Sequence, residues 1–195
     1  MEILILAVVT LPLLTALFLK VANRFLNELL TNFITINAAL LSVAVSFFMF
    51  GYLLLDKFKP IKFELFEWYP SPQIIFEFYL DGLSGVMMIL ISGLSLVIQL
   101  FSTSYMSKDE KYTKYFEYFN FFVFSMLLLV LSGNFLVMFF GWELVGLSSY
   151  LLISFWYEKN SAAKAGNKAF ILNRIGDFGF LIGLMMILNL SLIHI

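Results

Sequence analysis

The stretch "FFGWELVGLSSYLL", residues 139–152, decides how this chain is interpreted, because a single acidic residue, Glu143, lies in an otherwise mostly apolar run. An acidic side chain near the middle of a membrane helix costs about 2.5 to 3.5 kcal/mol on insertion scales. It should therefore face protein or water rather than lipid, and it needs a partner. Whether the run crosses a membrane follows from the rest of the chain.

The composition is that of a membrane protein. Of the 195 residues, 62% are hydrophobic and 13% are charged, and the mean hydropathy is +0.95. Twenty-four phenylalanines and several separate apolar runs exceed what one buried core could use, so several spans are expected rather than a single anchor. The first run has no basic residue before it and no small-residue cleavage site after it, which argues against a cleavable signal peptide.

The residue types present exclude several kinds of site. Cysteine is absent, so this chain offers no disulfide, no thiolate metal site and no cysteine-ligated iron–sulfur cluster. Histidine occurs once, at His194, and the sequence contains neither a P-loop nor a Gly-x-Gly-x-x-Gly turn. We therefore expect neither a metal site nor nucleotide binding.

Apolar runs of about 20 residues, the length that spans a bilayer, predict an all-α polytopic membrane protein with six transmembrane helices in one bundle. The predicted helices cover residues 3–24, 33–55, 82–104, 115–132, 134–156 and 168–190. The sequence Ser-Gly-Asn at 132–134 suits a tight turn between antiparallel helices. The chain stops at "NLSLIHI", directly after an apolar run, and we expect a truncated sequence rather than a natural C-terminus.

Basic residues are concentrated on one side of the predicted bundle. The long loop after the second span carries three, Lys57, Lys59 and Lys62. Eight follow the first, third and fifth spans: Lys20, Arg24, Lys108, Lys111, Lys114, Lys159, Lys164 and Lys168. The positive-inside rule therefore places the N-terminus outside. It places the loops with more basic residues in the cytoplasm, or in the matrix of an organelle.

The outward loop, residues 56–80, carries a pattern of its own. The sequence "IKFELFEWYPSPQIIFEFYL" partly alternates apolar and charged residues on both sides of Pro-Ser-Pro at 70–72. Such alternation around a turn predicts an extracytoplasmic β-hairpin. An irregular amphipathic loop on the lipid surface is the alternative.

Glu143 is the first candidate for a functional group. It follows Asn134, the start of its predicted span, by nine residues, so it lies about 13 to 14 Å deep, close to the middle of a bilayer core of about 30 Å. Helical spacing puts Glu143, Gly146 and Tyr150 on one face, which offers a groove and a hydroxyl group beside the carboxyl. We expect a titratable, functional residue. A neutral glutamic acid that only bonds two helices together is the alternative.

A second group of charges lies in "NRIGDFGFLIG", residues 173–183. Arg174 and Asp177 are three apart on a helix, within reach of an ion pair. Glycines at 176, 179 and 183 form a stripe suited to close helix packing. Arg174 is near enough to the cytoplasmic end to extend its side chain there, whereas Asp177 is not. A structural bridge that locks the bundle is the alternative to a functional pair.

The third span carries a mostly polar stripe. Asp81 opens this span, where capping the helix is its simplest role. The stripe behind it recurs every three or four residues: Ser84, Met88, Ser92, Ser95, Gln99 and Ser102. It predicts either a packing surface for another helix or a hydrated path.

Four stretches together closely resemble the N-terminal part of the subunit L family of NADH-quinone oxidoreductase, respiratory complex I, whose mitochondrial counterpart is called subunit 5. They are "YLDGLSGVMM", the Ser-Gly-Asn turn, "FFGWELVGLSSYLLISFW" and "KAGNKAFILNRIGDFGF". The resemblance covers nearly the whole chain, in order and spacing. Subunits of multisubunit cation/proton antiporters and of membrane-bound hydrogenases share the Trp-Glu helix and are the nearest alternatives. A purely structural membrane subunit is a further alternative.

The resemblance implies an antiporter-like, proton-translocating subunit of a complex that couples NADH:quinone electron transfer to proton pumping. It implies no cofactor in this chain, with NADH, FMN, iron–sulfur clusters and quinone belonging to other subunits. The implied partners are the other membrane-arm subunits, especially the neighbouring antiporter-like subunit, together with the lipid bilayer and protons, but no nucleic acid. The implied location is the inner (plasma) membrane of a bacterium, or the mitochondrial inner membrane if the chain is organellar.

The resemblance also implies roles for individual residues. The family glutamate that matches Glu143 pairs with a lysine on the seventh helix, and its charge is tied to proton movement. The residues that match Arg174 and Asp177 belong to the same charged neighbourhood, and the β-hairpin contacts other subunits. Family members are much longer, and their seventh helix would follow Ile195, so we expect Glu143 to lack this lysine partner within the chain.

Overall fold

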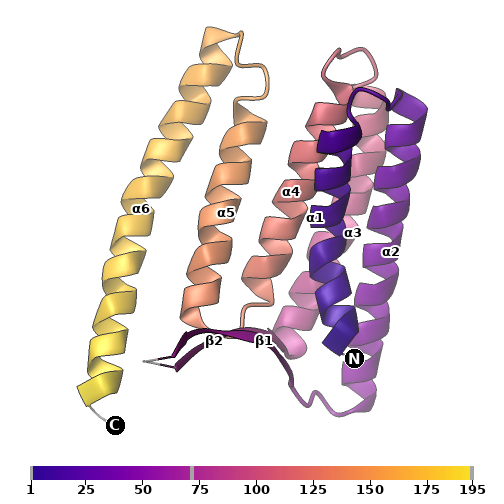
Figure 1. Ribbon diagram of the computed structural model, residues 1–195. Coiled ribbons are helices and arrows are strands. Elements are labelled where there is room, and N and C mark those ends of the chain that lie inside the picture. The colour runs from indigo at the N-terminus through magenta and orange to yellow at the C-terminus, as the bar shows by residue number, and fades with distance from the viewer. Residues whose placement is uncertain (1, 71–72, 194–195) are drawn as a thin grey trace.

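Six helices and one two-stranded sheet make up the computed structural model, which describes residues 2–70 and 73–193 (Figure 1). The helices are α1 (Glu2–Ala22), α2 (Glu28–Leu55), α3 (Gly82–Tyr105), α4 (Tyr112–Val130), α5 (Phe135–Ile153) and α6 (Asn160–Ile193). The strands β1 (Ile61–Pro70) and β2 (Gln73–Leu80) lie between α2 and α3 in the sequence. The predicted fold class, an all-α membrane protein with a β-hairpin between the second and third helices, is confirmed.

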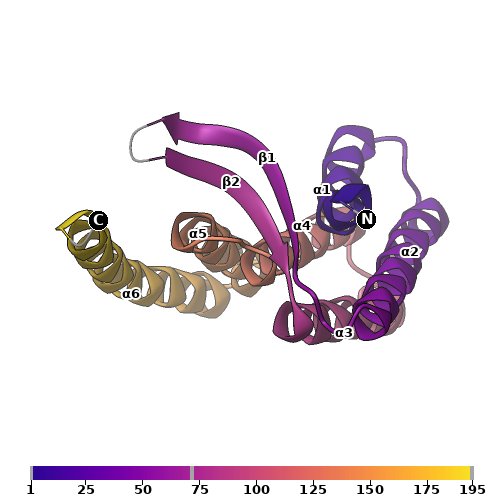
Figure 2. The ribbon, with the colours of Figure 1, turned by 90° about the horizontal axis from the view of Figure 1, so that it is seen from below.

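The helices stand side by side, with the hairpin across one end of the bundle (Figure 1). Helices α1 to α4 form a cluster, whereas α5 and α6 extend the bundle to one side (Figure 2). Helix α4 packs against both α1 and α5, α2 packs against α3, and α6 packs against α5. Helix α6 is therefore the outermost helix, and α5 joins it to the cluster.

Among the described residues, five helices are long and apolar enough to cross a membrane: α1, α2, α3, α5 and α6. Helix α4 carries Lys114 and Glu117 in its first two turns, which shortens its apolar part. The chain is a multi-pass membrane protein on these grounds.

Two helices begin earlier than their apolar composition predicts. Helix α2 starts at Glu28 instead of residue 33, and α6 starts at Asn160 instead of residue 168. Asn27 caps α2, because its side chain accepts a 2.9 Å hydrogen bond from the backbone N–H of Leu30. Hydropathy measures which residues favour lipid, whereas Ala and Lys continue a helix readily in water. The end of an apolar run is therefore not the end of its helix.

The strands pair antiparallel, as the hairpin prediction requires. The register runs from Ile61 opposite Leu80 to Pro70 opposite Gln73, with two irregularities that bend the ribbon. The alternative of an irregular loop is therefore wrong. Ser71 and Pro72, the middle of the predicted turn, lie outside the described residues.

The hairpin is attached to the turn between α4 and α5. The backbone N–H of Tyr79 donates to the carbonyl of Leu131 (2.8 Å), and the N–H of Gly133 donates to the carbonyl of Glu77 (2.9 Å). The side chain of Asn134 donates to the carbonyl of Ile75 (2.7 Å). The same side chain caps α5 by accepting from its first free N–H groups. The start of α5 is thus fixed on the sheet.

The three other connections lie at the opposite end of the bundle (Figure 1). They join α1 to α2, α3 to α4 and α5 to α6, and the eight basic residues that were assigned to one side belong to these connections and the adjoining helix ends. The hairpin side and the lysine-rich side are therefore two distinct ends of the molecule. Which end faces the cytoplasm stays a prediction of the positive-inside rule.

Candidate functional site

Glu143 lies on the face of α5 that packs against α6. The neighbouring positions on this face meet α6 as well: Gly146 faces Asn173, and the ring of Tyr150 lies 5.4 Å from that of Phe170. The Glu143 side chain is 21% exposed among the described residues. The face defined by helical spacing is therefore a helix–helix interface.

Arg174 on α6 provides the cation for Glu143. Its guanidinium Nη1 donates a hydrogen bond to Glu143 Oε2, which is also an ion pair. The sequence did not predict this contact, since the partner that the resemblance implies is a lysine and Arg174 was expected to pair with Asp177. The contact was missed because of the start of α6: a helix that begins at Asn160 places Arg174 about 21 Å along its axis rather than near its end.

The side chain of Arg174 makes a second contact, with an aromatic ring of its own helix. It lies across the ring of Phe170, with its central carbon 4.9 Å from the ring centroid, and reaches toward α5. It is 48% exposed among the described residues, so one side is open while the other contacts Glu143. The contact with Glu143 pairs the two charges, which is favourable because an unpaired intramembrane charge is costly.

Asp177 completes the charged group. Its Oδ2 lies 3.8 Å from Arg174 Nη1, so the predicted contact between these two residues is present. Its Oδ1 accepts a 2.9 Å hydrogen bond from the indole Nε1–H of Trp142. The Asp177 side chain is 9% exposed, the least of the three charged groups. Glu143, Arg174, Asp177 and Trp142 are hereafter called the α5–α6 charge cluster.

Trp142 was missed as a member of the site by sequence reasoning. It directly precedes Glu143, and the direction of its indole cannot be read from spacing alone. Its ring stacks on that of Phe180, with 6.3 Å between the ring centroids and an angle of 8° between the planes. Phe139 also stacks on the ring of Phe180, with 5.5 Å between the centroids. The available signal was the presence of an indole N–H, which needs an acceptor in an apolar environment.

The α5–α6 charge cluster holds two carboxyl groups and one guanidinium group. Arginine does not release its proton in proteins, so any proton that moves belongs to a carboxyl group. With both carboxyls ionised the cluster has one excess negative charge, which one proton or one further cation would neutralise. Within residues 2–70 and 73–193, no group of three His, Cys, Asp or Glu side chains is arranged to hold a metal ion.

The polar stripe of α3 is buried in the bundle. All six of its predicted members are buried, and the helix packs against α2 and α4. Gln99 Nε2 donates to Asn120 Oδ1 at 3.5 Å, and the hydroxyls of Ser102 and Tyr115 are 3.1 Å apart. The stripe is thus a packing surface between helices. Gln99 Oε1 and Ser42 Oγ have no hydrogen-bond partner among the described residues.

Asp81 caps α3. Its side chain accepts from the N–H of Ser84 at 2.8 Å, while Ser84 Oγ accepts from the N–H of Asp81 at 2.7 Å, which is a capping box. The backbone hydrogen bond from Ser84 holds the pKa of Asp81 below its usual value. Asp81 is separate from the α5–α6 charge cluster.

The glycine stripe of α6 does not mediate close packing in the part of the chain that the structure describes. A methyl group on Gly176, Gly179 or Gly183 would meet no atom within 4 Å. Gly141 on α5 makes the close approach instead, because a methyl group there would lie 2.8 Å from Leu129 Cα on α4. The spacing of glycines shows which face of a helix lacks side chains. It does not show whether another helix packs on that face.

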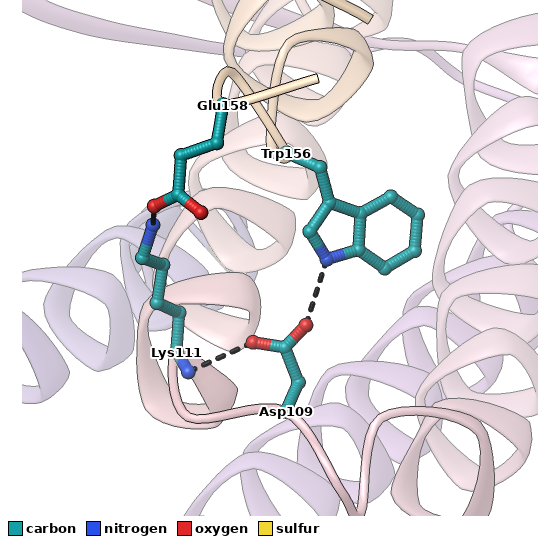
Figure 3. Close-up of polar contacts among 4 residues, drawn as sticks. All are labelled: Asp109, Lys111, Trp156 and Glu158. Atoms are coloured by element: carbon teal, nitrogen blue, oxygen red, sulfur yellow. Dashed lines mark hydrogen bonds and ion pairs between the residues drawn. The ribbon is translucent and has the colours of Figure 1, made fainter.

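A second polar group, at the lysine-rich end, ties the α3–α4 connection to the α5–α6 connection (Figure 3). Trp156 Nε1 donates to Asp109 Oδ2 at 2.7 Å, and Lys111 Nζ donates to Glu158 Oε1 at 2.6 Å. The hydrogen bond to Glu158 raises the pKa of Lys111. This loop clamp, Asp109, Lys111, Trp156 and Glu158, fixes the end of α5 opposite to the hairpin. Sequence analysis assigned it no role.

Two protein families and several curated proteins are similar to this chain. Residues 68–116 match the family described as NADH-ubiquinone oxidoreductase (complex I), chain 5 N-terminus, and residues 132–192 match the family described as NADH:quinone oxidoreductase/Mrp antiporter, TM. NADH-quinone oxidoreductase subunit L of Rickettsia bellii is 36% identical over 93% of this chain and 28% of its own length. NADH-ubiquinone oxidoreductase chain 5 of Rhizopus stolonifer is 38% identical over 93% of this chain and 28% of its own.

The chain thus spans just over a quarter of the length of these curated relatives. A solved structure, that of the membrane-bound sulfane sulfur reductase, an archaeal respiratory membrane complex, superimposes with a TM-score of 0.81. That match covers 94% of this chain and 36% of the other, at 22% sequence identity. At such identity the likeness concerns the fold alone.

Proposed function

Because this chain belongs to the subunit L and chain 5 family of NADH-quinone oxidoreductases, we propose that it forms part of a proton-translocating membrane subunit of such a complex. The complex couples electron transfer from NADH to quinone with proton pumping. NADH, FMN, iron–sulfur clusters and quinone belong to other subunits, and this chain binds none of them. Its partners are membrane-arm subunits, above all the neighbouring antiporter-like subunit.

One observation carries the proposal: the α5–α6 charge cluster, which places two carboxyls and one guanidinium on neighbouring membrane helices. Intramembrane charges are costly and typically mark ion or proton pathways. The proton affinity of such a carboxyl depends on the distance to the nearest cation. Glu143 is the proton-binding switch, and Arg174 with Asp177 sets the field around it.

The switch operates by changing which charge lies beside Glu143. Arg174 neutralises Glu143 in the described arrangement, and a shift of α6 against α5 separates the two groups. A separated Glu143 binds a proton, because an isolated carboxylate in the membrane is unfavourable. Restoring the contact with Arg174, or bringing another cation from elsewhere in the protein, releases that proton. Conformational or electrostatic signals from the neighbouring subunit drive this change.

The location follows from the same proposal. The protein resides in the inner (plasma) membrane of a bacterium, or in the mitochondrial inner membrane if it is organellar, with its N-terminus and hairpin on the outer side. The excess of basic residues at the other end supports this orientation.

The test is Glu143→Gln in the assembled complex, with Glu158→Gln as the matched control, since Glu158 belongs to the loop clamp. NADH:quinone electron transfer and proton translocation are measured together in proteoliposomes. We expect Glu143→Gln to abolish or sharply reduce translocation while the complex still assembles, and Glu158→Gln to translocate normally. Normal translocation in Glu143→Gln would remove this residue from the mechanism.

A cation/proton antiporter subunit is the second candidate, because the family that matches residues 132–192 includes Mrp antiporters. That function predicts Na⁺-dependent proton transport without electron transfer from NADH. A purely structural subunit, by contrast, predicts that neutralising Glu143 and Asp177 together leaves proton transfer intact.

A further inference from the structure

Asp177 lies between two competing donors. Its Oδ1 accepts from the indole of Trp142 at 2.9 Å, whereas its Oδ2 lies 3.8 Å from Nη1 of Arg174. A separation of 3.8 Å is too long for a hydrogen bond. The same Nη1 is hydrogen-bonded to Glu143. One guanidinium nitrogen therefore faces two carboxylates and bonds to only one of them.

Arg174 and Asp177 would be expected to pair closely if nothing intervened. They are three residues apart on α6, the spacing at which opposite charges on a helix meet. A buried carboxylate also requires donors, and Asp177 is the most buried carboxyl of the cluster. Trp142 supplies a donor to Oδ1, the oxygen other than the one nearest to Arg174, so the carboxylate has a hydrogen bond without closing onto the guanidinium.

The indole itself is held in place by stacking. Trp142 and Phe139 both stack on Phe180 of α6, so the ring that carries the donor is fixed at the α5–α6 interface. An aromatic donor fixed in this way positions its acceptor, because a rigid ring has little freedom to follow a moving carboxylate.

We propose that Trp142 is a positioning residue whose indole N–H holds the Asp177 carboxylate short of Arg174, so that Arg174 stays bonded to Glu143. This inference rests on the proposed function of Glu143. If the indole bond is lost, Asp177 turns to Arg174 and competes for it. Glu143 then loses its cation and with it the control of its proton.

The test compares Trp142→Phe with Trp156→Phe in the assembled complex. Phenylalanine keeps a ring that can stack on Phe180 but removes the N–H donor. Trp156→Phe removes an indole donor of the same kind, bonded to Asp109 in the loop clamp outside the helices. The measured quantity is the number of protons translocated per NADH oxidised, alongside the rate of electron transfer and the amount of assembled complex.

We expect the proton-to-NADH ratio to fall in Trp142→Phe, with assembly and electron transfer retained, and to stay at the wild-type value in Trp156→Phe. A structural role alone would lower assembly and would not change the ratio in the complex that does assemble. An unchanged ratio in Trp142→Phe would overturn the proposal.

A double mutant shows whether Trp142 acts through Asp177. In an Asp177→Asn background the competing carboxylate is gone, so Trp142→Phe should cause no further change in the ratio. An additional loss, equal to that seen in the wild-type background, would show that Trp142 acts by another route and would overturn the proposal. If Glu143→Gln itself translocates protons normally, the proposed function fails first; if only Trp142→Phe behaves as wild type, the inference about Trp142 fails alone.

Should Trp142→Phe not assemble, Phe180→Leu takes its place, because it removes the stacking surface and leaves the indole donor present. The expected result is again a lower ratio that depends on Asp177. A wild-type ratio in Phe180→Leu would count against the positioning role.

Discussion

Gly141→Ala is expected to weaken the contact between α4 and α5. The added methyl group would lie 2.8 Å from Leu129 Cα and 2.9 Å from Leu129 N, which are backbone atoms and cannot rotate away. Carbon atoms prefer separations of about 3.5 to 4.0 Å, so the helices must move apart by roughly 1 Å. Such overpacking costs about 1 to 3 kcal/mol. Alanine also favours a helix over glycine by about 1 kcal/mol, which partly offsets this cost.

Gly176→Ala is the matched control for this change. It makes the same substitution in a membrane helix, at a site where a methyl group meets nothing within 4 Å. It keeps the gain in helix propensity and carries no packing cost, so it should stabilise the chain by about 1 kcal/mol or less. The difference between the two variants is therefore the packing cost alone, about 1 to 3 kcal/mol.

Thermal unfolding of the detergent-solubilised protein, followed by circular dichroism, measures this difference. For a domain of this size, about 1 kcal/mol corresponds to roughly 2 to 4 °C in Tm. Gly141→Ala should therefore unfold about 2 to 12 °C below Gly176→Ala. If both variants shift Tm equally and in the same direction, the close approach of α4 and α5 at Gly141 is refuted.

Three further predictions concern the parts of the fold that hold α3 and α5. Asp81→Ala should destabilise α3 by about 0.5 to 2 kcal/mol, as seen in the Tm, whereas Asp81→Asn keeps a good cap and should cost less. Because the hydrogen bond from Ser84 holds the folded pKa of Asp81 below the ordinary aspartate value of 3.8, the stability that its charge adds is present above that value and is lost as pH falls through the folded pKa. The difference between wild type and Asp81→Asn should thus be constant at neutral pH and vanish in strong acid, and a difference that grows on acidification would contradict this. Asn134→Ala removes the cap of α5 and the bond to Ile75, so we expect a loss of about 1 to 2 kcal/mol and faster proteolysis of the hairpin; unchanged proteolysis would show that the hairpin is held by other contacts. Trp156→Phe breaks an exposed hydrogen bond to Asp109 and should cost about 1 kcal/mol or less in the same unfolding measurement; a loss several times larger would mean that the loop clamp supports the whole bundle.

The fold could largely be predicted from the sequence. The apolar runs located six helices, and the alternation around Pro-Ser-Pro located the hairpin, because both patterns follow directly from the periodicity of the backbone. The start of α6 was missed by eight residues, since Asn160 and the residues after it are polar yet helical. That single error moved Arg174 from the interior of its helix to its end.

The candidate site was predicted only in part, for a related reason. The face of Glu143, Gly146 and Tyr150 was correctly derived from helical spacing, which depends on one helix alone. The contact between Glu143 and Arg174 depends on the relative height of two helices, and the bond from Trp142 depends on a side-chain direction. Neither quantity is contained in the spacing of residues along one helix.

The central claim, that Glu143 binds and releases a proton during turnover, is tested most directly by infrared difference spectroscopy of the assembled complex. The measurement compares the complex before and during NADH oxidation, and it detects the C=O stretch of a protonated carboxyl group. We predict a carboxyl band that changes with turnover in the wild type and in Glu158→Gln and is missing in Glu143→Gln. Identical turnover-dependent carboxyl bands in the wild type and in Glu143→Gln would contradict the claim.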